Sequence, residues 1–161
     1  MGLFDRYTKK NEKPIVHQDP VLKAPLKPLA YPPKILLAWG EAISGNKEIR
    51  EWLLKNDYEE LGIFVYALNN VSDARRWLMV NGYAHLLAML TAAEGDQVAI
   101  DWLKKHRLEA LMHMAAFIDG EKNSIVWLTQ YDPLYAGLAR KMRVIKLQIE
   151  NNNDDPHRMS F

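Results

Sequence analysis

Hydrophobic residues recur along this chain with a period of 25 residues. The dipeptide Trp-Leu marks the period most plainly, because it occurs four times, beginning at Trp52, Trp77, Trp102 and Trp127. Repeats of about 20 to 50 residues are typical of stacked supersecondary units, none of which buries its apolar face alone. The pattern therefore predicts an array of similar helical units.

The segment around each Trp predicts a short amphipathic helix. In residues 47–55, Ile49, Trp52 and Leu53 form one apolar stripe at helical spacing, and charged residues occupy the other side. Small residues hold the position of Ile49 in the later copies, namely Ala74, Ala99 and Ser124. A small residue beside a large Trp favours close helix packing, so we expect an outward-facing helix whose Trp belongs to the core.

The longer segments between these helices predict a second, inner kind of helix. Their apolar residues form three columns with the same period: Leu36, Leu61, Leu86, Leu111 and Ala136; Trp39, Phe64, Met89 and Met114; Ile43, Leu68, Ala93 and Ile118. The opposite side is also largely apolar, with Ala38, Ile63 and Ala88. A helix that is apolar nearly all round is buried on more than one side, so we expect these helices to form the inner layer.

Turn residues recur in step with the helices. Gly45, Asn70, Gly95 and Gly120 share one position of the period, and Gly82 follows an outer helix. Glycine and asparagine tolerate the positive φ that ends many helices. Asp132-Pro133 predicts an N-cap followed by proline at the first helical position, and Asp57 with Glu60 has the spacing of a capping box.

These patterns predict an all-α fold, a right-handed α-solenoid of about five short αα-hairpin repeats over residues 33–151. The last unit has no loop signal between Pro133 and Asn151, which predicts a long C-terminal capping helix. We expect its basic residues to form a solvated face, namely Arg140, Lys141, Arg143 and Lys146. Six prolines between residues 14 and 33 predict an extended Pro-rich N-terminal arm over residues 1–32, and residues 152–161 are expected to be a flexible tail.

Composition narrows the classes of function. The chain has no cysteine, which excludes disulfides and thiolate chemistry. No apolar run approaches the roughly 20 residues that cross a membrane, and the first residues lack the apolar stretch of a signal peptide, so we expect a cytoplasmic protein without a membrane partner.

Charge is unevenly distributed along the chain. Residues 31–132 hold ten Lys and Arg against fourteen Asp and Glu, while both ends are basic. An acidic middle argues against nucleic-acid binding, which needs a basic face along the body of the fold. The acidic middle fits a basic partner. It also fits basic ends that bind the body of the same chain or a neighbouring copy, and the second case would be a homo-oligomer formed through the N-terminal arm.

One stretch resembles a known family. Residues 95–103 resemble the second half of an ankyrin repeat in the spacing from glycine to the apolar positions, and Met112-His113-Met114-Ala115-Ala116 is similar to the Leu-His-x-Ala-Ala of its first helix. The period here is shorter than the family's 33 or so residues, and the β-turn finger and the Thr-Pro opening are absent. The resemblance implies an ankyrin-like helix pair and, by analogy, a protein-binding role.

Two groups of polar residues are candidate sites. His85 and His113 occupy nearby positions on successive inner helices, on a face shared with Glu59, Tyr66, Thr91 and Glu109, so a groove there could perform acid–base chemistry. Four carboxylates are expected at neighbouring loop tips, where they could hold a divalent cation or a basic peptide: Glu94, Asp96, Asp119 and Glu121. No local spacing matches a catalytic triad, a metal motif or a phosphate loop, so we predict no cofactor and no metal.

The sequence favours a non-catalytic binding module or scaffold. Its inner-helix face or acidic loop edge would take a segment of a protein partner, and the N-terminal arm of this chain or of a second copy is a possible occupant. Two alternatives stay open: a small ligand-binding protein or enzyme that uses the His and carboxylate groove, and a structural subunit that assembles head to tail.

Overall fold

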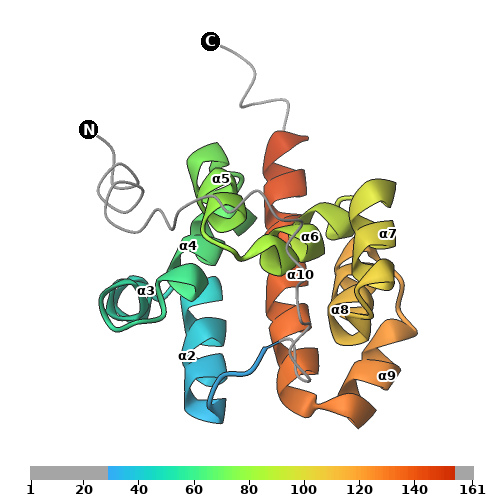
Figure 1. The fold of residues 1–161 in the computed structure, drawn as a ribbon, viewed down its shortest axis with the longest axis horizontal. Helices are drawn as coiled ribbons and strands as arrows, with labels where there is room; N and C mark the ends of the chain where they lie inside the picture. The colour runs from blue at the N-terminus through green and yellow to red at the C-terminus, as the bar shows by residue number, and fades with distance from the viewer. Residues whose placement is uncertain (1–28, 155–161) are drawn as a thin grey trace.

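In a computed structural model that describes residues 29–154, this part of the chain forms nine helices and no strand (Figure 1). The all-α prediction is confirmed. The helices are α2 (Pro33–Ile43), α3 (Lys47–Lys55), α4 (Glu59–Leu68), α5 (Ser72–Val80), α6 (Ala84–Ala93), α7 (Gln97–Lys105), α8 (Glu109–Asp119), α9 (Ser124–Tyr131) and α10 (Pro133–Asn153). Most of the predicted arm and tail, residues 1–28 and 155–161, lie outside the described residues, and α10 ends two residues beyond the predicted boundary.

Helices alternate between a buried and a half-exposed kind. α2, α4, α6 and α8 pack on one another in that order, and each of α3, α5, α7 and α9 packs on the helices before and after it. Eight residues of the ten-residue α4 are buried, whereas α3 buries only Leu53 and Leu54. All three predicted columns are buried, and the ring of Trp39 meets that of Phe64 edge to face at 4.9 Å between centroids.

The turns adopt the backbone conformation that their residues favour. Gly45, Asn70, Gly95 and Gly120, which follow the buried helices, all have positive φ, as does Gly82. The predicted capping box at Asp57 is wrong, because Asp57 itself has φ of 66° and α4 has no side-chain cap at its N-terminus. Glu60 turns inward instead and accepts a hydrogen bond from Tyr31.

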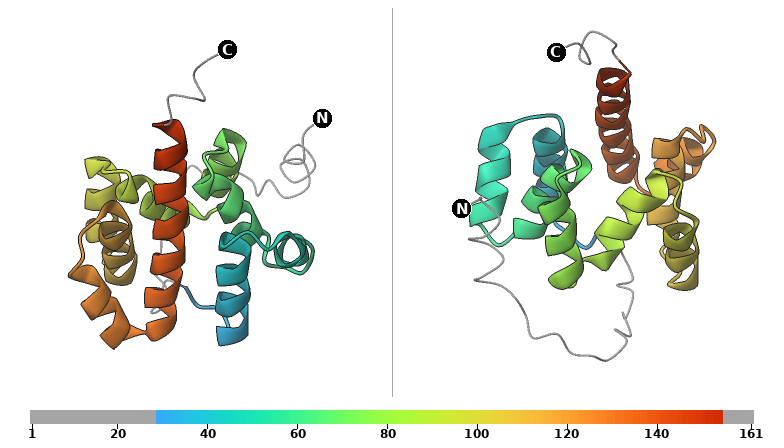
Figure 2. Two further views of the ribbon diagram at one scale, coloured as in Figure 1. Left: turned by 180° about the vertical axis from the view of Figure 1, so that it is seen from behind. Right: turned by 90° about the horizontal axis from the view of Figure 1, so that it is seen from above.

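The last helix closes the array of buried helices onto the first. α10 packs against α2, α4, α8 and α9, and it runs beside α2 in Figure 1 and in the view from behind in Figure 2. The close approach is made at Gly40, where an added Cβ would lie 3.3 Å from Lys141 Cδ, and Lys141 Nζ binds Glu41 Oε1 at 3.0 Å. The two helices that would be the free ends of an open array therefore cover each other.

The basic residues of α10 do not form the solvated face that was predicted. Only Arg140 is exposed, while Lys141, Arg143 and Lys146 are half-buried and bind groups on other helices. The reason is that α10 crosses the C-terminal ends of the buried helices, where backbone carbonyls lack helical partners and attract cations. None of the helices in residues 29–154 is long and apolar enough to cross a membrane.

The leucines and tryptophans of the Trp-Leu pairs differ in burial, although both were predicted to lie in the core. Each leucine of the pair is fully buried, at Leu53, Leu78, Leu103 and Leu128. Of the four tryptophans in these pairs, only Trp77 is in the core, with 3% of its surface exposed, whereas Trp52 is 47% exposed. Both rings stack on the tyrosine six residues later, with centroids 6.1 Å apart for Trp52 and Tyr58 and 5.8 Å for Trp77 and Tyr83. The Trp lies at the edge of the apolar stripe, so its neighbours decide how far it is buried.

Replacing Gly62 with alanine is expected to destabilise the fold by about 1–2 kcal/mol, even though alanine favours a helix by about 1 kcal/mol. A Cβ at Gly62 would lie 2.6 Å from Cδ2 of Leu54, and because Leu54 is itself buried, moving it aside would disturb the core. Gly137 of α10 is the matched control, because nothing lies within 4 Å of its Cβ position and Gly137→Ala should stabilise. Urea unfolding of both variants measures the difference, and a stabilised Gly62→Ala would refute the tight α3–α4 packing.

Candidate functional site

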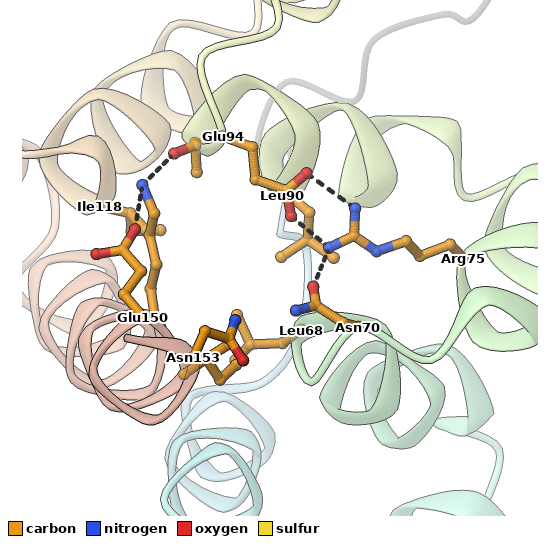
Figure 3. A pocket seen from close by; sticks show the side chains of 11 residues that line it. Leu68, Asn70, Arg75, Leu90, Glu94, Ile118, Glu150 and Asn153 are labelled. Carbon is orange, nitrogen blue, oxygen red and sulfur yellow. Dashed lines mark hydrogen bonds and ion pairs between the residues drawn. The ribbon is translucent and has the colours of Figure 1, made fainter. Parts of the chain in front are cut away.

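A pocket of about 360 Å³ lies between the C-terminal ends of three buried helices and the last turns of α10 (Figure 3). Its floor is apolar and comes from four helices: Leu68 of α4, Leu90 and Ala93 of α6, Ile118 of α8 and Ile149 of α10. Its rim is polar and consists of Asn70, Arg75, Glu94, Lys146, Glu150 and Asn153. Sites for small ligands and for peptide side chains commonly combine an apolar floor with a few fixed polar groups in this way.

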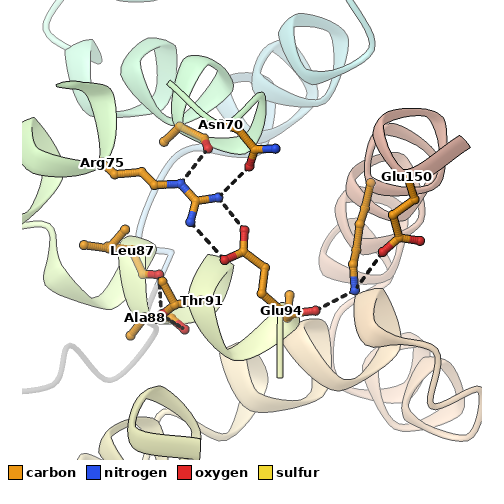
Figure 4. Close-up of polar contacts among 10 residues, drawn as sticks. Asn70, Arg75, Leu87, Ala88, Thr91, Glu94 and Glu150 are labelled. Carbon is orange, nitrogen blue, oxygen red and sulfur yellow. Dashed lines mark hydrogen bonds and ion pairs between the residues drawn. The ribbon is translucent and has the colours of Figure 1, made fainter. Parts of the chain in front are cut away.

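Arg75 of α5 forms one side of the rim, and its guanidinium is held by three groups (Figure 4). Nε donates to the carbonyl of Ala67 at 3.1 Å, and Nη2 donates to Oδ1 of Asn70 at 3.1 Å. Nη1 donates to Oε2 of Glu94 at 3.0 Å while Nη2 binds the other oxygen of the same carboxylate. A bidentate pair of this kind fixes the geometry as well as adding energy.

The opposite side of the rim belongs to α10. Lys146 Nζ donates to the carbonyl of Ala93 at 2.8 Å and lies 3.2 Å from Oδ1 of Asp119 and 3.6 Å from Oε1 of Glu150. One turn earlier, Nη1 of Arg143 donates to the carbonyl of Phe117 at 2.7 Å. Together with Arg75, these side chains place one cation at the C-terminal end of each of α4, α6 and α8, which is the favourable end for positive charge.

The four carboxylates predicted at the loop tips serve two different purposes. Glu94 lines the pocket, and Asp119 binds the ammonium of Lys146 at its edge. Asp96 instead accepts from the first backbone amides of α7, and Glu121 accepts from those of α9, so both cap helices. Within residues 29–154, no three His, Asp or Glu side chains gather closely enough to hold a metal ion.

His113 lies beside a serine that the sequence reasoning did not connect with it. Its Nδ1 is 3.3 Å from Oγ of Ser124, and its Nε2 is 4.0 Å from Oε1 of Glu109. The Ser124 hydroxyl donates its proton to the carboxylate of Glu121, so Oγ accepts from the histidine. The hydrogen bond from the Ser124 hydroxyl also lowers the pKa of the Glu121 carboxyl. With Trp127 stacked on His113 at 4.1 Å, the group caps and packs α9, and the serine is not activated as a nucleophile.

The remaining predicted residues lie along the buried helices. Burial lowers the pKa of His85, so its imidazole is neutral at pH 7. The guanidinium of Arg50 lies over the ring of Tyr66, 4.6 Å from its centroid. The hydroxyl of Thr91 donates to carbonyls of its own helix, and Glu59 stands in the first turn of α4, where a carboxylate suits the helix dipole.

A second polar cluster surrounds Glu60, whose surface is only 7% exposed. The hydroxyl of Tyr31 donates to Oε1 of Glu60 at 2.6 Å, and the Glu60 carboxylate adds to burial in raising the pKa of the neighbouring Tyr83. Tyr31 belongs to the short segment before α2. In the same segment Leu29 is buried, and its carbonyl accepts a hydrogen bond from the hydroxyl of Tyr135 at 3.3 Å. The cluster therefore fastens this segment to α4 and α10.

Unfolding free energy is expected to fall steeply between about pH 10 and pH 12. Burial raises the pKa of Tyr83 and of Tyr135 to about 12, and burial next to Glu60 raises that of Tyr31 further. The folded state then holds these protons while the unfolded tyrosines, with pKa near 10, release them, so the contribution of the three tyrosines to stability is constant below pH 10 and is lost above it. Denaturant unfolding at several pH values measures the unfolding free energy, and tyrosinate absorbance measures the ionisation of the tyrosines. Full ionisation of the tyrosines in the folded protein near pH 10 would contradict their burial.

Sequence reasoning found Glu94 and Asp119 but missed most of the pocket. Arg75 occupies the same repeat position as Arg50. An arginine in one repeat and an acidic loop in the next could have predicted the ion pair between Arg75 and Glu94. Lys146 and Asn153 gave no such signal, because only the packing of α10 across the buried helices brings them there.

The residues that line the pocket come from five helices and two turns that are far apart in the sequence, so no short motif describes the site. Comparison of the chain with protein-family models, with curated proteins and with solved structures found no match.

Proposed function

We propose that this protein is a non-catalytic helical-repeat protein that binds a segment of a partner protein in the pocket between α4, α6, α8 and α10. The observation that carries the proposal is the pocket itself, an apolar floor drawn from four helices inside a rim of fixed polar groups. A volume of about 360 Å³ suits one or two large apolar side chains. The amides of Asn70 and Asn153 on the rim suit the backbone of a peptide.

The chemistry of the lining supports binding over catalysis. The described residues that line the pocket are Leu, Ile, Ala, Asn, Arg, Lys and Glu, so they offer carboxylates and cations but no hydroxyl or imidazole. The cations are already engaged, Arg75 by Glu94 and Lys146 by Asp119 and Glu150. Such groups fix the orientation of a bound ligand, whereas nucleophilic catalysis needs a nucleophile beside a base.

The proposal includes the repeat architecture predicted from the sequence. Five units, each a buried helix followed by a half-exposed one and the last reduced to α10, would form a short right-handed solenoid. Stacked repeats commonly present a concave surface to protein partners, and the ankyrin resemblance supports the same role by analogy. The packing of α10 on α2 disfavours head-to-tail assembly, because both ends of the array are covered. The cytoplasmic location and a dimer formed through the N-terminal arm stay predictions.

Selection of a random peptide display library on the full chain tests this function. We expect enriched peptides to carry a large apolar residue and to lose at least about tenfold in affinity when Asn153 on the rim is replaced by tryptophan, because the bulky ring covers the opening. Gln148→Trp is the matched control, since Gln148 is exposed on the same helix and does not line the pocket. Peptides that bind all three proteins equally, or a library without enrichment, would contradict the proposed function.

A further inference from the structure

The charges around the pocket indicate which peptides it accepts. Three buried helices end there, and carbonyls of their last turns, those of Ala67, Ala93 and Phe117, accept hydrogen bonds from Arg75, Lys146 and Arg143. Each helix C-terminus carries about half a negative charge. Arg75 pairs with Glu94, and Lys146 pairs with both Asp119 and Glu150, while Arg143 binds only a backbone carbonyl. Three cations and three carboxylates are equal in number, so the helix ends leave the site with a net negative charge.

The exposed surface formed by the rim and the neighbouring Asp119 is more acidic than the charge count alone suggests. The side chains of Glu94, Asp119 and Glu150 are 43%, 48% and 52% exposed, whereas those of Arg75 and Lys146 are 22% and 20% exposed. The cations point inward to carbonyls, whereas the carboxylates stay about half exposed beside the opening. In Figure 3 the labelled Glu94 points toward Arg75 across the rim. An approaching ligand therefore meets negative charge first.

We infer that the pocket selects a partner segment in which a large apolar side chain is flanked by lysine or arginine. This inference rests on the proposed function and names its ligand class. The apolar side chain lies on Leu68, Leu90 and Ile118, and the flanking cation binds Glu150 or Glu94 at the rim. A segment with an acidic flank is rejected, because it would meet solvent-facing carboxylates at short range in an environment less polar than water.

The same peptide selection tests this inference separately. Enriched peptides should carry Lys or Arg within two residues of the apolar anchor, and exchange of that residue for Glu should weaken binding about tenfold at low salt, less at high salt. Glu150→Lys should weaken the basic peptide by a similar factor. Asp101→Lys, the same charge change on an exposed residue outside the lining, should alter its Kd less than twofold at physiological salt.

The outcomes separate the two proposals. Pocket-dependent peptides with neutral or acidic flanks would overturn the inference and leave the proposed function standing. An absence of peptides sensitive to Asn153→Trp would overturn both. A Kd that improves more than tenfold when residues 1–28 are removed would assign the pocket to the chain's own basic arm, and would overturn the assignment to a partner protein.

Discussion

Trp77→Ala is expected to lower the unfolding free energy by about 3–5 kcal/mol, the usual range for removing a fully packed Trp side chain. Trp77 is 3% exposed, and its ring is parallel to that of Tyr83 within 4° at 5.8 Å. Its Nε1 is buried and has no hydrogen-bond partner in residues 29–154, so part of the cost of burial is relieved when the ring is removed. We therefore expect a value nearer 3 than 5 kcal/mol, measured by urea unfolding.

Two further variants make this prediction specific. Trp52→Ala, at the same repeat position, should cost less than about 1.5 kcal/mol, because Trp52 is 47% exposed. Trp77→Phe should cost less than Trp77→Ala, since it keeps an aromatic ring against Tyr83 and removes the unpaired N–H. Equal losses for the alanine variants at Trp52 and Trp77 would mean that burial differs less between them than the structure shows.

Tyr31→Phe is expected to destabilise the fold by about 1.5–3 kcal/mol, the range for a hydrogen bond to a charged group. The lost bond joins the Tyr31 hydroxyl to the buried carboxylate of Glu60 at 2.6 Å, and the variant removes this phenolic donor from the carboxylate. An incompletely paired buried charge costs more than the hydrogen bond itself contributes. Guanidinium unfolding of the full chain gives the difference.

Tyr58→Phe is the matched control for Tyr31→Phe. The Tyr58 ring packs on the rings of Tyr31 and Trp52, and the variant keeps those contacts while removing only the hydroxyl. It should change stability by less than about 0.5 kcal/mol. In a Glu60→Gln background the cost of Tyr31→Phe should shrink, which a double-mutant cycle would report as coupling. Equal losses of unfolding free energy for Tyr31→Phe and Tyr58→Phe would show that the hydrogen bond from Tyr31 does not stabilise the buried Glu60 carboxylate.

Local patterns predicted the buried columns and the turns because both follow from short-range physics. Leu61, Leu86 and Leu111 are fully buried, as expected for one face of an inner helix, and the predicted glycine and asparagine turn residues after the buried helices have positive φ. The burial of the tryptophans was less predictable. Trp52 and Trp77 share a repeat position and each stacks on the equivalent tyrosine, yet one is exposed and the other buried, so the repeat position alone does not determine burial.

The candidate site was harder to predict than the fold. Glu94 and Asp119 were recognised as acidic loop residues, but their partners, Arg75 and Lys146, lie 19 and 27 residues away. Lys146 reaches Asp119 and the carbonyl of Ala93 only because α10 crosses the ends of α6 and α8. No periodicity within α10 encodes that crossing, so its basic residues were expected to be solvated.

The most direct test of the binding pocket is to map a selected peptide on the full chain by amide chemical shifts in solution. Our account predicts that the largest shifts fall on the residues around the opening, in ranges 68–70, 90–95, 117–119 and 146–153, and that Asn153→Trp abolishes them. Shifts centred instead on α3 around the exposed Trp52, with the pocket amides unmoved, would contradict it.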